Sequence, residues 1–142
     1  IDAVCAGSDF NAPHRAAVAV IAQGLVALGL VEGPASRALE TGSFQRFYMH
    51  PTGHWLGLDV HDVGDYKFEG AWRSLEPGMV TTVEPGIYIA ADAPVPPCWR
   101  GIAIRIEDDV LVTRSGREVL SEGLPKQPDA VEALVGSAAH AL

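Results

Sequence analysis

The sequence predicts an α+β fold in which an antiparallel sheet lies between helices at the two ends of the chain. A helical pattern opens the chain, strand-like stretches fill its middle, and a second helical pattern closes it over residues 128–142. Strands that follow one another without intervening helices are typical of antiparallel sheets in α+β domains. The length of 142 residues corresponds to about one domain.

The opening helix is expected to start after Asn11, a favourable N-cap residue, with Pro13 in its first turn. Its end is expected within 29–33, a glycine-containing segment before Pro34. A short second helix is expected over 34–42. The apolar residues at helical spacing in the first helix are Val18, Ile21, Leu25 and Leu28.

Strands are expected over 55–61, 79–89 and 101–113, where β-branched and aromatic residues gather between turn residues. The closing helix is expected to use Val131, Leu134 and Val135 as its apolar side. No linker or short repeat divides the chain. These segments therefore predict a single unit.

Composition narrows the class of protein. The net charge is −8 without basic runs, which argues against nucleic acid or an anionic membrane as partner. No apolar run reaches the roughly 18 residues that a membrane-spanning helix needs. Cys5 and Cys98 have no metal-binding spacing and are interpreted as free thiols, which favours a reducing, cytoplasmic location. The first residue is Ile1 rather than Met, which suggests a fragment.

The segment 101–113 is expected to have two unlike faces, because side chains alternate along a strand. Ile102, Ile104 and Ile106 share one face, which suggests packing. Arg105 and Glu107 lie on the other face, which fits either a polar site or a solvated surface with a salt bridge.

Glu84 ends a β-rich run directly before Pro85, so it is either an exposed carboxylate or one that the turn aims at a site. A polar cluster precedes it, formed by His50, His54, Asp59, His61 and Asp62. Pro51 and Gly53 exclude the helix that an HxxxH zinc motif requires. Asp59 and His61 are expected to share a strand face. The cluster fits a metal site or a set of satisfied core histidines.

Considered together, one histidine and two glutamates near separate strands are able to converge across a sheet. Such a carboxylate-rich set with one imidazole suits Mn²⁺, Co²⁺ or a two-metal hydrolase. Arg105 precedes Glu107 by two residues and is placed to orient the carboxylates.

Three segments closely resemble bacterial Xaa-Pro aminopeptidases (aminopeptidase P): MHPTGHWLGLDVHDVGDY, LEPGMVTTVEPGIYIA and RGIAIRIEDDVLVT. The resemblance extends back into the APHRAA helix and forward to the PK and DAVEAL tail. It implies a pita-bread fold, of which residues 1–142 are the C-terminal portion of the catalytic domain. It also implies two divalent metal ions, most often Mn²⁺.

The resemblance assigns roles to individual residues. His54, Glu84 and Glu107 match metal ligands, and Glu84 also handles the proton of the attacking water. His61 matches a histidine that contacts substrate, and His50 matches one near the proline side. Tyr88 and Arg105 match residues that form hydrogen bonds with the metal ligands in the family.

The family's remaining ligands are upstream aspartates, and neither Asp2 nor Asp9 matches their motif. The family's amino-terminal domain is also missing, so the chain alone is expected to be inactive and to expose apolar surface. In the parent enzyme, the expected substrate is a peptide with proline in second position and the expected assembly is a homo-oligomer. The alternatives are a prolidase, specific for Xaa-Pro dipeptides, and a non-catalytic remnant that binds a partner half.

Overall fold

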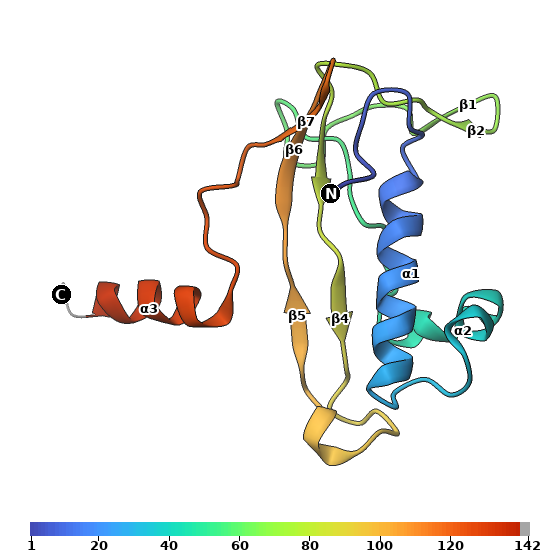
Figure 1. Ribbon diagram of the computed structural model, residues 1–142, viewed down its shortest axis with the longest axis vertical. Coiled ribbons are helices and arrows are strands. Elements are labelled where there is room, and N and C mark those ends of the chain that lie inside the picture. Colours follow the sequence, from blue (N-terminus) through green and yellow to red (C-terminus); the bar gives the residue numbers. More distant parts are fainter. Residues whose placement is uncertain (140–142) are drawn as a thin grey trace.

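The computed structural model describes residues 1–139 and has the expected α+β architecture (Figure 1). Helix α1 lies beside a long, antiparallel pair of strands, and α3 stands away from the body on the other side. None of the helices in residues 1–139 has the length and apolar character to cross a membrane. In chain order the helices and strands are α1 (Ala12–Ala27), α2 (Ala35–Thr41), β1 (Lys67–Phe68), β2 (Ala71–Trp72), β3 (Val80–Val83), β4 (Gly86–Tyr88), β5 (Ala103–Arg105), β6 (Asp108–Thr113), β7 (Gly116–Val119) and α3 (Pro128–Ala139).

Helices α1 and α2 confirm the two helices expected near the start. Asn11 occupies the N-cap of α1 but its side chain makes no capping hydrogen bond. The N–H of Leu30 donates to the carbonyl of Leu25, which closes the end of the helix, and Gly29 there has a φ of +70°. Val18 and Leu25 are buried as expected, whereas Leu28 is 47% exposed.

Two segments expected as single strands are each divided in two. The expected strand 79–89 becomes β3 and β4, separated at Pro85, and 101–113 becomes β5 and β6. Strand β3 pairs with β6, which also pairs with β7, and β4 pairs separately with β5. The division occurs at the same level in both segments because proline has no N–H to donate to a sheet. In Figure 1, β4 and β5 continue the line of the β3 and β6 pair.

The segment 55–61 is not a strand, so that prediction is wrong. Trp55 makes one isolated bridge to Thr81, and the chain then folds back so that the N–H of Asp62 donates to the carbonyl of Trp55. The Asp62 side chain packs closely against Gly57, where a Cβ would lie 1.8 Å from a carboxylate oxygen of Asp62. Without a strand, Asp59 and His61 do not share a strand face.

Two hydrophobic cores stabilise the chain. One packs α1 and α2 against β4 and its neighbours, including Leu25, Phe47 and Ile89. The other lies beneath the β3, β6 and β7 sheet and includes Trp55 and Val110. The sequence did not predict the hairpin of β1 and β2 or strand β7.

The isoleucine face of 101–113 is less packed than expected. Ile104 is 60% exposed and Ile106 is 48% exposed. Together with Ile102, Leu28 and other apolar side chains they line an apolar groove of about 320 Å³ between α1 and the β4 and β5 pair. The predicted apolar side of the closing helix is also exposed, at Val131, Leu134 and Val135.

Candidate metal centre

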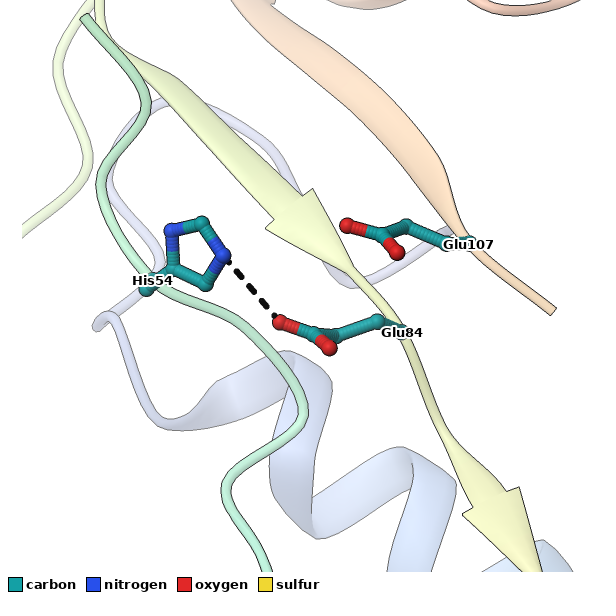
Figure 2. A group of neighbouring side chains, drawn as sticks. All are labelled: His54, Glu84 and Glu107. Carbon is teal, nitrogen blue, oxygen red and sulfur yellow. Dashed lines mark ion pairs between the residues drawn. The ribbon is translucent and has the colours of Figure 1, made fainter. Parts of the chain in front are cut away.

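His54, Glu84 and Glu107 come together as the sequence suggested. Each offers a ligand atom, and these atoms lie within 4.8 Å of one another (Figure 2). His54 comes from the loop after α2, Glu84 directly follows β3, and Glu107 lies between β5 and β6. Both glutamates therefore sit at the level where the long strands are divided. The division frees their backbone from the sheet and allows the carboxylates to turn toward His54.

The imidazole of His54 is held with one nitrogen free for a ligand. Its Nδ1 lies 2.9 Å from the carbonyl oxygen of Trp55, which only accepts, so Nδ1 carries the hydrogen and donates it. Nε2 is then left with its lone pair, 3.3 Å from Oε1 of Glu84. Metal-binding histidines are usually oriented in this way, by a hydrogen bond from the ring nitrogen that does not bind the metal.

Two threonines of β3 fix the position of His54. The N–H of His54 donates to the hydroxyl of Thr82, and the hydroxyl of Thr81 donates to the carbonyl of His54, each at 3.0 Å. The Thr82 hydroxyl in turn donates to Oε1 of Glu84 at 3.2 Å. One buried hydroxyl thereby connects the main chain of one ligand with the carboxylate of another.

Close packing brings the His54 loop against β3. A Cβ on Gly53 would lie 2.0 Å from the carbonyl oxygen of Thr82, a distance that no side chain tolerates. Glycine at this position is therefore required for the approach of the loop to the strand. The sequence identified His54 but not this supporting set, although Gly53 and the two adjacent threonines were its only signal.

Arg105 contacts the second oxygen of Glu84. Its guanidinium donates to Oε2 at 3.3 Å, while the Arg105 side chain is 50% exposed. Arg105 therefore contacts this carboxylate from the solvent side. Because the guanidinium partner is half exposed to solvent, the attraction of the pair is screened and contributes more to geometry than to stability.

His50 and Tyr88 form a neighbouring pair. The Tyr88 hydroxyl lies 3.0 Å from Nε2 of His50, and Nδ1 of His50 lies 2.7 Å from the carbonyl oxygen of Pro51. With Nδ1 donating to that carbonyl, Nε2 of neutral His50 accepts from Tyr88. Gly86 makes room for the phenol, since a Cβ there would lie 2.6 Å from the Tyr88 oxygen.

His61 lies against His54 with ring centroids 4.3 Å apart in an edge-to-face arrangement, and it is exposed. Among residues 1–139, the group of possible ligands consists of His54, Glu84 and Glu107 and includes no aspartate. Neutral imidazole with two carboxylates is a donor set for a hard or borderline divalent cation. These residues fit such an ion, and their small number leaves coordination positions for other ligands.

Residues 1–114 match the family model described as metallopeptidase family M24. The chain belongs to metallopeptidase family M24. Its α+β arrangement is that of the C-terminal part of the pita-bread fold, as the similarity to solved aminopeptidase P structures shows.

Individual relatives in the family are similar over most of this chain. Xaa-Pro aminopeptidase from Escherichia coli is 50% identical over 121 residues, which are 85% of this chain and 27% of that protein. The structure of aminopeptidase PepP from Pseudomonas aeruginosa superimposes with a TM-score of 0.93 at 54% identity, over 98% of this chain and 32% of that one. A zinc-substituted aminopeptidase P from Escherichia coli in complex with product gives a TM-score of 0.79 at 50% identity, over 85% of this chain and 27% of that one. The chain thus spans about a third or less of these relatives.

Proposed function

We propose that residues 1–142 form the C-terminal portion of the catalytic domain of an Xaa-Pro aminopeptidase, which releases the N-terminal residue from peptides with proline in second position. The observation that carries the proposal is the convergence of His54, Glu84 and Glu107 from separate segments. Relatives in the M24 family named Xaa-Pro aminopeptidase support this activity over that of a dipeptide-specific prolidase.

In the longer protein this centre would hold two divalent ions, and we propose Mn²⁺ as the native metal. Metals bound there supply Lewis acidity and lower the pKa of a water molecule, so that a nucleophile exists near neutral pH. When metal is bound, His54 would offer Nε2, and Glu84 and Glu107 would each offer a carboxylate as ligand. Zinc substitution of the Escherichia coli relative indicates that such a centre accepts more than one metal.

The remaining residues act on the substrate and its proton. Glu84 accepts the proton of the attacking water, because its carboxylate is nearly buried yet faces the other ligands. His61 donates a hydrogen bond to the oxyanion of the tetrahedral species. His50, oriented by Tyr88, lies on the proline side, and Arg105 keeps the Glu84 carboxylate in place.

The metal-ligand group in residues 1–139 consists of three side chains. Two metals need more donors than three side chains provide, and these are expected from upstream aspartates in a longer protein. Residues 1–142 alone are therefore proposed to be inactive, with a cytoplasmic, homo-oligomeric parent. The alternative, a non-catalytic module that binds a partner half, is favoured by the exposed apolar groove beside α1.

The test compares two proteins with added Mn²⁺. Release of the N-terminal residue from an Xaa-Pro-Xaa peptide is measured for residues 1–142 and for a version extended upstream by about one half-domain, as in the longer relatives. Activity of the extended form alone supports the proposal, and its loss in Glu107→Gln supports the ligand assignment. Turnover by the short chain contradicts the incomplete site, and activity confined to Xaa-Pro dipeptides indicates a prolidase.

A further inference from the structure

His14 lies outside the metal centre but contacts the segment that carries it. It belongs to the first turn of α1, and its Nδ1 lies 2.9 Å from the hydroxyl oxygen of Thr52. Thr52 is 2% exposed and precedes His54 by two residues. A side chain of the helix thereby reaches the loop that presents the histidine ligand.

Thr52 also holds the main chain of Glu84. The N–H of Glu84 donates to the carbonyl oxygen of Thr52 at 2.6 Å. This hydrogen bond, together with those of His54 to Thr81 and Thr82, ties the loop to the end of β3 on both sides of Gly53. The main chain of Thr52 is therefore hydrogen-bonded to Glu84 and lies two residues before His54.

The Thr52 hydroxyl has a second buried partner, the phenol of Tyr48. Tyr48 is 1% exposed, and a buried hydroxyl hydrogen without an acceptor costs stability. If Tyr48 donates to Thr52, the Thr52 hydroxyl is free to donate to Nδ1 of His14, and every hydrogen in the series has an acceptor. This order requires His14 to be neutral, with its hydrogen on Nε2.

The surroundings of both rings favour this order. Burial is the main cause that lowers the pKa of His14, and the nearby His50 lowers it further. Burial raises the pKa of the Tyr48 phenol, which the hydrogen bond with Thr52 partly opposes and Glu84 reinforces. Neutral His14 and protonated Tyr48 are therefore the forms that the folded chain stabilises.

We propose that His14 is a positioning residue of the metal centre. Its Nδ1 accepts a hydrogen bond from the Thr52 hydroxyl, and this contact holds the Thr52 carbonyl against the N–H of Glu84. His14 itself touches neither ligand. The inference rests on the proposed function only where it treats His54 and Glu84 as metal ligands, and the contact chain from His14 to Glu84 is independent of any metal.

Amide hydrogen exchange of the metal-free chain tests the contact chain directly. In His14→Leu, the Glu84 amide is expected to exchange about tenfold faster, the factor for loss of roughly one net hydrogen bond. In His14→Asn, whose side-chain oxygen is able to accept from Thr52, exchange is expected to return close to that of the unmodified chain. The matched control is Arg15→Ala on the same turn, whose side chain is exposed and pairs with Asp9. Equal Glu84 exchange in His14→Leu and Arg15→Ala overturns the proposal.

Thr52→Val removes the same hydrogen bond from the other side and keeps the experiment decisive if His14→Leu does not fold. Adding His14→Leu to Thr52→Val is expected to change Glu84 exchange by less than about twofold, because both substitutions break one contact. Additive effects of the two substitutions contradict the proposal.

Zn²⁺ and Mn²⁺ titration calorimetry on the same proteins then separates this inference from the proposed function. His14→Leu is expected to weaken metal binding by roughly tenfold, the lower end of the range for residues that orient ligands, and His14→Asn to restore it. Unchanged affinity in His14→Leu contradicts the positioning role while leaving the metal centre intact. Absence of binding by the unmodified and the upstream-extended chains contradicts the metal centre, and hydrogen exchange still decides the role of His14.

Discussion

The Nε2 atom of His54 lies 3.3 Å from Oε1 of Glu84, and the two side chains are 14% and 12% exposed. When Nδ1 donates to the Trp55 carbonyl, the neutral form of this imidazole turns the lone pair of Nε2 toward the Glu84 carboxylate oxygen. These donors favour a cation beside them, and Glu107 completes the group from the neighbouring long strand, between β5 and β6 (Figure 2).

Replacement of this carboxylate is expected to abolish metal binding. Glu84→Gln keeps the shape of the side chain but loses a charged ligand, so we expect affinity for Zn²⁺ or Mn²⁺ to fall by at least about 100-fold, the upper range for residues that merely orient ligands. Calorimetric titration measures the change. Glu76→Gln removes a carboxylate at an exposed position elsewhere and should leave affinity unaltered. Equal affinities in the two variants would contradict the assignment of Glu84 as a ligand.

Gly53→Ala is expected to disturb both stability and metal binding. Its Cβ would lie 2.0 Å from the Thr82 carbonyl, so the His54 loop must move away from β3. We expect a loss of about 1–3 kcal/mol in the free energy of unfolding, the usual range for an overpacked site. Urea unfolding measures it, with Gly123→Ala as control because a Cβ there meets no atom within 4 Å. A Gly53→Ala chain as stable as the control would show that the loop has room to shift.

Acid is expected to destabilise the chain partly through His14. Burial lowers its pKa in the folded state below the ordinary 6.5, so the unfolded chain binds the proton more readily. The free energy of unfolding should therefore be unaffected by His14 above about pH 6.5, fall as pH drops below that value, and level off once the folded pKa is passed. Urea unfolding at about pH 7.5 and about pH 5.5 should show a smaller difference for His14→Asn than for the unmodified chain. The same difference in both proteins would show that His14 titrates alike in the folded and unfolded chain.

The exposed isoleucine face predicts self-association of residues 1–142. Ile104→Lys places a charge in the apolar groove, where Ile104 is 60% exposed, and should reduce association without loss of folding. Sedimentation velocity across a concentration series measures the effect. Val20→Lys, at a 69% exposed position of α1 that does not line the groove, is the matched control. An unmodified chain that stays a monodisperse monomer across the concentration series would refute the expectation.

Local chemistry made part of this molecule predictable. Asn11, Pro13 and the glycines after residue 28 marked the limits of α1, because caps and breakers act within a few residues. Glu84 and Glu107 stood out because a carboxylate is an unusual residue type at a strand end or beside a row of isoleucines. His54 was one of several histidines and aspartates in a polar cluster, and only the resemblance to Xaa-Pro aminopeptidases singled it out.

The features that the sequence predicted wrongly, or did not reveal, depend on contacts between distant segments. The loop at 55–61 has the composition of a strand, but Gly57 and Asp62 fold it back on itself. The isoleucines of 101–113 alternate as in a packed strand, yet in residues 1–139 Ile104 and Ile106 remain 60% and 48% exposed at the edge of an open groove. The link from His14 through Thr52 to Glu84 spans three separate segments, so no short sequence pattern reveals it.

The two cores of the chain meet at the level of the two glutamates. One core belongs to α1 and the β4 and β5 pair, the other to the β3, β6 and β7 sheet, and Glu84 and Glu107 stand at the passage from one to the other. An ion bound there would cross-link the two cores. With the ion bound, the two cores should unfold in one cooperative thermal transition. Without it, each core is able to unfold at its own temperature.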